Sequence, residues 1–268
     1  MTNIRDLVQS IKTDRIHGAS ELANHTLEVL SEVTLAIQAE EPQHIVEVIR
    51  MVAEDIQQAR PTMAPVSYCT KLYLQLMEQV ACESKSVLEL KNQVARLVNL
   101  IQDEMATKKS MVIEKAAVIA AESQVVLTCS YSSTVMQALV TARNFNNTLK
   151  ALVVESVYEG ISYGQIMAQR LSEASVKCVL IPDNAIVKGL KEAKLILLGA
   201  DSIMPDGSVI NGYPSLLTAE LAKQAIPPVP VLVIGESIKK CAEKLTDIED
   251  GFELVPSDLI TRIITDQG

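Results

Sequence analysis

The feature that most constrains this chain is a long stretch without glycine or proline. Residues 66–159 contain neither, whereas nine of the ten glycines lie at or beyond Gly160. Because both residue types interrupt regular structure, their absence favours continuous helices. Residues 20–40 and 42–59 also place apolar side chains three and four positions apart, which is the period of an amphipathic helix. The first third of the chain is therefore predicted to be helical.

A longer, more polar helix is predicted over residues 84–115. Such a helix buries one apolar stripe and exposes its charges. The predicted stripe runs through Leu88, Val94, Leu97, Leu100 and Ile101.

The period changes in the second half of the chain. Short apolar runs, each followed by a helical pattern, appear at Val125–Thr128, Ala151–Val154, Lys177–Ile181, Leu195–Leu198 and Val229–Ile234. Strands that are apolar on both faces and alternate with helices indicate a mainly parallel sheet covered on both sides. The fold class is therefore α/β, with a helical domain over residues 1–120 and an α/β domain over residues 121–268.

Composition excludes several classes of function. The formal net charge is −9, Trp is absent and there are two Phe, so direct nucleic-acid binding is not expected. No apolar run is long enough to span a membrane, and the first residues do not resemble a secretory signal. We therefore expect a cytoplasmic protein.

The five cysteines fit that compartment, because an odd number without a close pair makes a poor disulfide framework. Neither the cysteines nor the histidines have the spacing of metal ligands. Each cysteine taken alone is interpreted as a small core residue. No metal and no cofactor are expected.

Polar residues follow the predicted strands, and ligands bind outside the carboxyl ends of strands in open α/β sheets. Ser132 and Ser133 follow the first strand and open a helix, where hydroxyl and backbone N–H groups can bind an anion or simply cap the helix. Glu155, Asp183 and Asp201 follow the next three strands. A carboxylate there can transfer a proton, bind sugar hydroxyls or close an Asx turn. We expect Asp201, Glu155, Asp183 and Ser130 to converge in one cleft.

Longer motifs carry a resemblance over nearly the whole chain. The segments LTCSYSSTV (127–135), LLGADSIMPDGSVIN (197–211) and VPVLVIGES (229–237) are preceded by RIHGAS (15–20) and RPT (60–62). In this order they resemble the superfamily of eukaryotic initiation factor 2B alpha, beta and delta subunits. That superfamily includes ribose-1,5-bisphosphate isomerase and methylthioribose-1-phosphate isomerase.

The resemblance implies a helical N-terminal domain on a Rossmann-like C-terminal domain, with a phosphorylated substrate between them. It also implies dimers formed largely through the C-terminal domain and, in some members, hexamers. The enzymes of this superfamily convert an aldose 1-phosphate to a ketose with a cysteine and an aspartate as the acid/base pair.

Carrying the motifs over residue by residue leaves the catalytic pair incomplete. Asp201 falls on the catalytic aspartate, and Asn211 agrees with the pattern around it. Ser130 falls on the position of the catalytic cysteine, with Cys129 one residue early. A hydroxyl is far less acidic than a thiol, so Ser130 would transfer a proton slowly. In an extended segment Cys129 would point away from the face that Ser130 uses, and we expect no local bulge to re-aim it.

Two cations of the isomerases are also replaced. This chain has Glu155-Ser156-Val157-Tyr158 and Asn211-Gly212-Tyr213-Pro214-Ser215 where the isomerases carry an arginine and a lysine. The resemblance leaves a set of candidate groups for the substrate and its phosphate. They are Arg15, Gly18, Ala19, Ser20, Arg60, Ser132, Ser133, Glu155, Asp183, Asn211 and Lys239, of which Lys239 could equally be a solvated surface lysine.

Three functions remain open on these residues. The first is an initiation-factor-2B-like protein that binds a sugar phosphate or nucleotide and is regulatory or weakly catalytic. The second is an aldose–ketose isomerase of phosphorylated pentoses that uses Asp201 with Cys129 or Ser130. The third is a diverged member with another ligand. A homodimer or hexamer is expected, with initiation-factor subunits as candidate partners.

Overall fold

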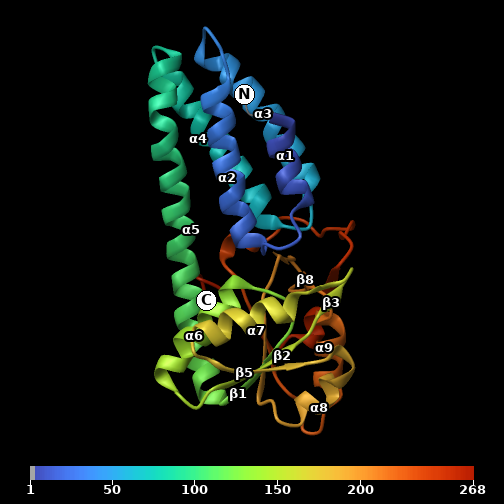
Figure 1. Cartoon of the computed structure of the whole chain (residues 1–268). Helices are drawn as coiled ribbons and strands as arrows, with labels where there is room; N and C mark the ends of the chain where they lie inside the picture. The colour runs from blue at the N-terminus through green and yellow to red at the C-terminus, as the bar shows by residue number, and fades with distance from the viewer. Residues whose placement is uncertain (1–3) are drawn as a thin grey trace. The chain divides into compact units, whose positions relative to one another are not determined.

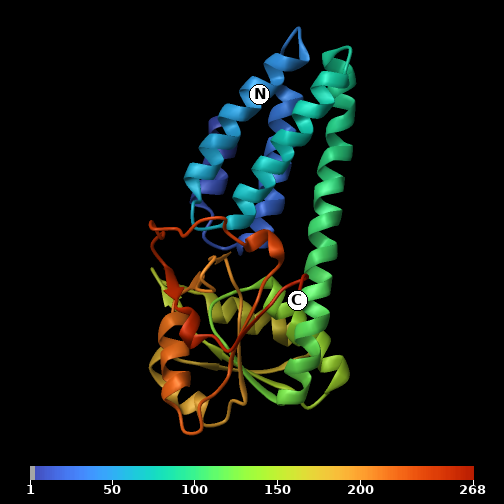
Figure 2. The same ribbon diagram turned by 180° about the vertical axis from the view of Figure 1, so that it is seen from behind.

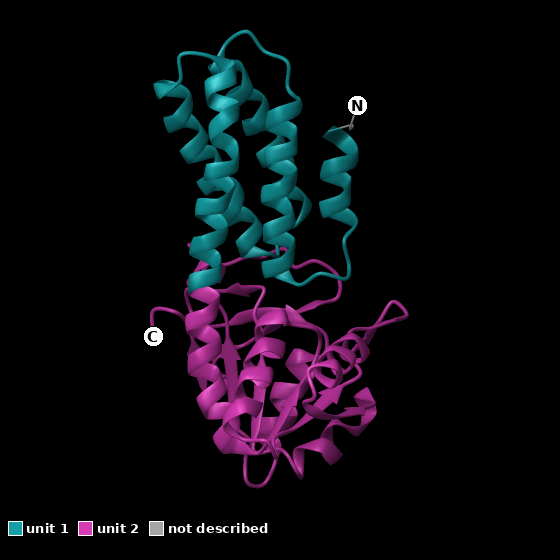
Figure 3. Ribbon diagram, turned by 60° about the vertical axis from the view of Figure 1, so that its left-hand side comes forward, with its two compact units in different colours: residues 1–107 teal, residues 108–268 magenta. Residues whose placement is uncertain are grey.

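The computed structural model describes residues 4–268. The chain divides into two compact units, residues 1–107 and 108–268, shown in separate colours in Figure 3. Long helices occupy the first part of the chain (Figure 1). They are α1 (Ile4–Thr13), α2 (Ala19–Ala36), α3 (Pro42–Ala59), α4 (Ala64–Glu83) and α5 (Val87–Ser123).

Unit 1 is a bundle in which α4 packs on α2 and α3, and α1 packs on α2 and α3. Pro42 and Pro65 lie in the first turns of α3 and α4, where a missing N–H costs no helical hydrogen bond. Tyr73 is fully buried, and its hydroxyl lies 2.9 Å from Oγ1 of Thr34. The predicted helical first third is thus observed as a packed bundle.

The predicted stripe of the long helix is wrong at two positions. Leu88 and Leu100 are 69% and 58% exposed. The buried side chains of that part of α5 follow three- and four-residue spacing from Leu90, and Leu88 and Leu100 fall outside that face. This buried set is Leu90, Val94, Leu97, Val98, Ile101 and Met105. The helix also runs to Ser123, well beyond the predicted end at residue 115.

Unit 2 is built on a six-stranded sheet with the order β11-β9-β6-β1-β2-β5. All neighbouring strands are parallel. The strands are β1 (Val125–Thr128), β2 (Lys150–Val154), β5 (Lys177–Ile181), β6 (Leu195–Leu198), β9 (Val231–Ile234) and β11 (Arg262–Ile264). The five predicted runs are all strands, although β9 begins two residues later than predicted. The short edge strand β11, with Arg262 exposed, carries too few apolar residues to be recognised from the sequence.

Helices cover both faces of this sheet (Figures 1 and 2). Val126 packs towards the second half of α5, α6 (Ser133–Phe145) and α7 (Tyr163–Glu173). The next residue, Leu127, packs towards α8 (Ile186–Leu190) and α9 (Ser215–Gln224). Successive residues of a strand point to opposite faces, so apolar residues throughout a strand indicate burial on both sides. The α/β class is confirmed.

Short strands that the sequence did not predict precede α7 and α9, and within the described residues no α-helix follows β9, contrary to the predicted helical pattern. After β2 the chain forms the hairpin β3 (Val157–Tyr158) and β4 (Ile161–Ser162) before α7 begins. After β6 it forms β7 (Ser202–Ile203) and β8 (Val209–Gly212), which with β10 (Phe252–Val255) make an antiparallel sheet. The turn at Asp206-Gly207, with Gly207 at φ +80°, reverses the chain between β7 and β8, and the crossover helix α9 begins only at Ser215.

The remaining ordered segments are short 3₁₀ turns, η1 (Asp183–Ala185), η2 (Ser237–Lys239) and η3 (Ser257–Leu259). Each follows closely the end of a strand, and η1 and η2 bring polar side chains to the carboxyl edge of the parallel sheet. Within residues 4–268, no helix combines the length and apolar character required to cross a membrane.

Candidate functional site at the carboxyl edge of the sheet

The strand order places a topological switch between β1 and β6. From β1 the chain adds β2 and β5 on one side, and from β6 it adds β9 and β11 on the other. The connections leave these two neighbours in opposite directions, which opens a crevice outside their carboxyl ends. The segments at this crevice are residues 129–133 after β1 and residues 199–201 after β6. Most of the polar residues predicted from the motifs belong to unit 2 and follow such strand ends.

Ser130 adopts an unusual backbone conformation directly after β1. Its φ is +59°, in the left-handed region that residues other than glycine rarely adopt. Its N–H donates a 2.7 Å hydrogen bond to Oγ of Ser156, which itself has a φ of +53°. Such strained residues persist only where their surroundings hold them, and they cluster at functional sites.

Asp183 holds the turn that supports Ser130. Its carboxylate accepts hydrogen bonds from the N–H groups of Ser156 and Val157, at 2.7 and 3.1 Å. Asp183 is thereby connected to Ser130 through Ser156. These contacts are long-range, so Asp183 shapes the carboxyl edge by joining the ends of β2 and β5 and not by a local Asx turn.

Two glycines allow the segments of the site to approach one another closely. A Cβ atom on Gly199 would lie 2.6 Å from Oγ of Ser132. A Cβ on Gly212 would lie 2.4 Å from Oγ of Ser130. Both separations are shorter than nonbonded atoms tolerate, so a side chain at either position would force the neighbouring serine to move. The glycines bring the loop after β1 against the chain after β6 and against β8.

Cys129 points into the core on the α9 side of the sheet. Its Sγ lies 3.5 Å from Oγ of Ser215, and its side chain is buried. Burial raises the pKa of this thiol to about 11, so it stays protonated at neutral pH. A general acid or base works best with a pKa near the working pH, which Cys129 does not have.

Ser215 connects that thiol to Asn211. Nδ2 of Asn211 donates to Oγ of Ser215 at 2.8 Å, and that hydroxyl donates to the carbonyl oxygen of Gly212 at 2.6 Å. Asn211 is buried on β8, and its side-chain Oδ1 lies 3.6 Å from where a Cβ atom on Gly199 would be. The network holds the Asn211 side chain beside the chain that leads to Asp201.

Asp201 lies two residues beyond the Gly199 contact and is buried, with 9% exposure. Its N–H donates to the carbonyl oxygen of Ile210 at 2.8 Å, which fixes the residue at the start of the antiparallel sheet. Glu155 is partly buried after β2, where its carbonyl oxygen accepts from Oγ of Ser162 and from the N–H of Gly164. That Glu155 and Asp201 share one cleft with Ser130 stays a prediction.

Lys239 is buried, which corrects its interpretation as a solvated surface lysine. Its Nζ lies 3.0 Å from Oε2 of Glu236, and both residues are at most 2% exposed. Oε1 of Glu236 accepts from Oγ1 of Thr134 at 3.2 Å. Burial raises the pKa of Glu236, but the Lys239 ammonium and hydrogen bonds lower it further, so the net shift is downward. The aliphatic part of the Lys239 side chain packs against Gly235. A Cβ atom on Gly235 would also lie 3.4 Å from Cβ of Ala200.

A second lysine, absent from the motif analysis, reaches the same helix start. Nζ of Lys109 on α5 donates to Oγ of Ser133 at 3.0 Å, and its charge contributes to lowering the pKa of Glu236. Ser132 caps α6, since its Oγ accepts from the N–H of Val135. The sequence feature that could have identified Lys109 is its position on the helix. It lies four residues after Met105 and three before Val112, and so interrupts the buried face of α5. Two lysines and one glutamate thus surround the first turn of α6.

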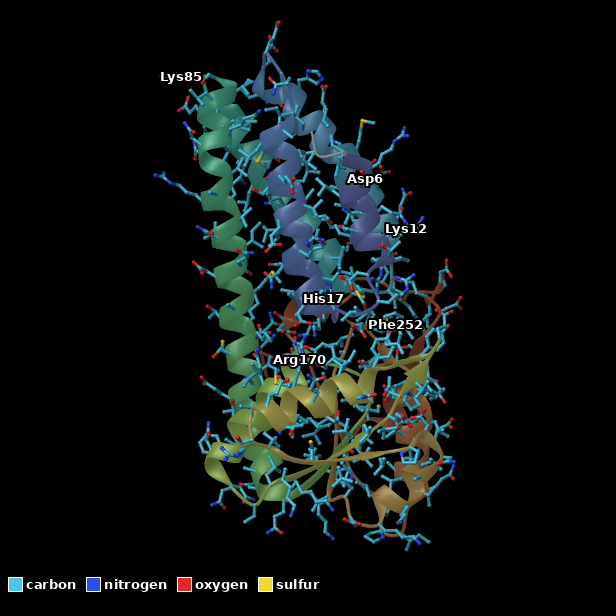
Figure 4. All side chains as sticks on the ribbon, viewed as in Figure 1. Asp6, Lys12, His17, Lys85, Arg170 and Phe252 are labelled. Atoms are coloured by element: carbon cyan, nitrogen blue, oxygen red, sulfur yellow. The ribbon has the colours of Figure 1, made fainter. Side chains whose placement is uncertain are left out.

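The two arginine candidates in unit 1 contact carbonyl oxygens at the end of α1, where Figure 4 labels Lys12. Nη1 of Arg15 donates to the carbonyl oxygens of Lys12 and Asp14, and Nη1 of the buried Arg60 donates to that of Asp14 at 2.7 Å. Gly18 is the N-cap of α2, whose first residues are Ala19 and Ser20. That these groups bind a phosphate stays a prediction. Among residues 4–268, no three His, Cys, Asp or Glu side chains are grouped as a metal site would require.

An open parallel sheet with helices on both faces and conformationally constrained polar loops at its switch point defines a doubly wound α/β protein. Residues 15–250 match the family described as the Initiation factor 2 subunit family, and the chain belongs to that family.

Curated relatives carry two kinds of name. A protein named ribose 1,5-bisphosphate isomerase, from Haloterrigena turkmenica, is 28% identical over 86% of this chain and 68% of its own. A putative translation initiation factor eIF-2B subunit 2-like protein, from Pyrococcus furiosus, is 27% identical over 98% of this chain and 94% of its own.

Solved structures share the fold. The translation initiation factor eIF-2B of Pyrococcus horikoshii has a TM-score of 0.81 at 21% identity and covers 99% of this chain and 95% of its own. A chain of the tetrameric eIF2B-beta2-delta2 complex of C. thermophilum has a TM-score of 0.78 at 18% identity, with coverage of 99% and 89%. The family resemblance found in the motifs is confirmed.

Proposed function

We propose that this protein binds a phosphorylated small molecule, a sugar phosphate or a nucleotide, at the carboxyl edge of the unit 2 sheet, and that its role is regulatory or weakly catalytic. The observation that carries the proposal is the first turn of α6. Its N–H groups, the Ser133 hydroxyl and the ammonium groups of Lys109 and Lys239 favour a negative charge, with Glu236 as the counter-ion of one lysine. The protein is proposed to work in the cytoplasm, where its free thiols stay reduced.

A thermal-shift series tests this proposal. The ligands are ribose 1,5-bisphosphate, methylthioribose 1-phosphate, AMP and GMP, each compared with its dephosphorylated form. A ligand present at 100 times its Kd stabilises the folded protein by ~2.7 kcal/mol. For a chain of this size that corresponds to a rise in Tm of about 5–10 °C. Equal shifts with phosphorylated and dephosphorylated compounds would contradict the proposal.

A matched pair of variants locates the site. Lys109→Met removes the cation that contacts Ser133, whereas Lys177→Met removes an exposed lysine at the amino end of β5. A charge-assisted hydrogen bond contributes about 1.5–3 kcal/mol, so Lys109→Met is expected to weaken binding by roughly 10-fold or more. Lys177→Met is expected to leave the affinity unchanged.

An aldose–ketose isomerase is the second candidate, because Asp201 is present and buried at the strand end where the motif predicts a catalytic aspartate. The name of the Haloterrigena relative also supports this candidate. The buried, protonated Cys129 and the hydroxyl of Ser130 weigh against it. The binding function is therefore preferred to catalysis.

We also propose that the chain assembles as a homodimer or hexamer, mainly through residues after about Val125, with initiation-factor subunits as further candidate partners. The edge strand β5 supports this: its neighbouring residues Val179 and Leu180 are 42% and 40% exposed, although they point to opposite faces of the sheet. Parallel strands are normally covered on both faces, and exposed edges invite pairing.

A further inference from the structure

A cavity of about 580 Å³ opens at the amino edge of the unit 2 sheet. Its walls come from α8, α9 and the turns that lead into β6 and β9. Its volume falls within the ~300–1,000 Å³ of small-molecule pockets. This edge is opposite to the carboxyl edge where Ser130 and Asp201 lie, so the cavity is a separate place on the unit.

The walls of the cavity are mostly apolar. Leu190, Leu221 and Val229 line it, and Val187 on α8 contributes a side chain that is 55% exposed. The rim is apolar as well, because Ile226 is almost fully exposed beside the prolines of the turn before β9. Isolated exposed apolar residues are ordinary, but a concave group of them indicates a binding surface.

Backbone hydrogen bonds hold both turns in place. The N–H of Lys194 donates to the carbonyl oxygen of Val125 at 2.9 Å, and the N–H of Val229 donates to that of Ala222 at 3.1 Å. In addition, the N–H of Ile196 in β6 donates to the carbonyl oxygen of Pro230. The cavity is therefore preformed, so ligand binding would cost little conformational entropy of the two turns.

The charged side chains that line this cavity are all positive. They are Lys191 and Lys194, and no aspartate or glutamate is part of the lining. Both lysines are exposed, and neither side chain makes an ion pair or hydrogen bond with any residue between 4 and 268. In a chain with a net charge of −9, an apolar cavity bordered by uncompensated lysines selects for negative charge.

We propose that this cavity binds an anionic amphiphile, a small molecule with an apolar body and one carboxylate, sulfonate or phosphate group. The apolar body lies against Leu190, Leu221 and Val229. The anionic group lies at the rim, between the ammonium groups of Lys191 and Lys194. Neutral amphiphiles gain only the apolar part of this interaction, and cationic ones meet repulsion.

The test uses the fluorescent anion 8-anilinonaphthalene-1-sulfonate, whose emission rises in apolar surroundings. Competitors are decanoate, decanol and decyltrimethylammonium, each below its micellar concentration. We expect one probe molecule to bind per chain and decanoate to displace it at a concentration at least fivefold lower than decanol. Displacement by the cationic compound that equals that by decanoate would overturn the proposal.

Variants assign the signal to the cavity. Lys191→Glu and Lys194→Glu are each expected to weaken probe and decanoate binding about threefold to fivefold, and together at least tenfold. Val187→Asp places a carboxylate on the exposed part of the wall and is expected to weaken binding at least tenfold. Lys177→Glu makes the same charge change at the amino edge outside the cavity and is expected to leave binding unchanged. Fluorescence that is unaffected by the three cavity changes, or lowered equally by Lys177→Glu, would contradict the assignment.

Circular dichroism and thermal melts of every variant separate lost binding from lost folding. Val187, Lys191 and Lys194 are all exposed, so their replacement leaves the core intact. Phosphate-ester binding at the carboxyl edge is expected to be unchanged in these variants. The cavity proposal and the proposed function can therefore fail separately.

Discussion

Nζ of Lys239 lies 3.0 Å from Oε2 of Glu236, and the protein buries both groups beside the first turn of α6. This pair links the end of β9 to the helix that follows β1, because Thr134 of α6 donates to the same carboxylate. A buried ion pair of this kind adds little net stability compared with apolar residues, but removing one partner leaves an uncompensated charge.

Lys239→Met is expected to destabilise the protein by about 3–5 kcal/mol for that reason. Urea unfolding measures the change. In the double variant Glu236→Gln/Lys239→Met no charge is left unpaired, so we expect it to be more stable than Lys239→Met alone. The control is Lys240→Met, which removes a neighbouring exposed lysine that contacts Gln267. A loss below about 1 kcal/mol for Lys239→Met would show that the pair is not desolvated as described.

The same pair predicts a dependence of stability on pH. The pKa of Glu236 is lower in the folded than in the unfolded protein. The ionised carboxylate therefore makes its full contribution to the free energy of unfolding above the unfolded pKa of about 4.3. That contribution is lost as the pH falls through the lower pKa of the folded protein. Unfolding free energies of wild type and Glu236→Gln, measured from pH 7 to pH 3, should converge as the pH falls. A constant difference across that range would disprove this linkage.

Gly212→Ala is expected to destabilise the protein by about 1–3 kcal/mol, because the added methyl group would overlap Oγ of Ser130. Removing that hydroxyl should relieve much of the strain. In a Ser130→Ala background, Gly212→Ala should therefore cost at most half as much. Chemical denaturation of the four proteins of this cycle measures the coupling, and additive effects would mean that the two residues do not touch.

Catalysis can be decided with two substitutions. We expect weak or absent turnover of ribose 1,5-bisphosphate by wild type and by Cys129→Ala, because the Cys129 thiol is buried and protonated. Ser130→Cys places a thiol where the family motif has one, and is expected to raise turnover above the wild-type rate. A coupled isomerase assay makes the comparison. Robust wild-type activity that Cys129→Ala abolishes would establish the isomerase instead.

Assembly depends on the exposed edge of the sheet. Leu180→Lys places a charge on β5 and is expected to shift the protein from dimer or hexamer to monomer at micromolar concentration. Light scattering coupled to size-exclusion chromatography measures the mass. Val118→Lys, on an exposed position of α5 in unit 2, serves as the control. A monomeric wild type would refute the proposed assembly.

The local sequence pattern was sufficient to predict the helices and strands that bury apolar residues at regular intervals. Strands such as Leu195–Leu198 are apolar at every position because helices cover both faces of the sheet, and that composition is visible in the sequence. The same strand pattern placed Asp201 after the fourth run, and it follows the end of β6. The antiparallel strands β7, β8 and β10 were not predicted, because they are short and their pairing joins residues 202–212 to residues 252–255.

The direction and surroundings of single side chains depended on tertiary structure. Lysine is normally found at the protein surface. Only the packing of Glu236 and Gly235 around Lys239 makes it a buried cation. Lys109 lies far from every motif in the sequence, yet α5 carries it to Ser133. A sequence thus determines which residues follow each strand, because that information is local. Which of them face one another, and with what pKa, is decided by contacts between segments distant in the chain.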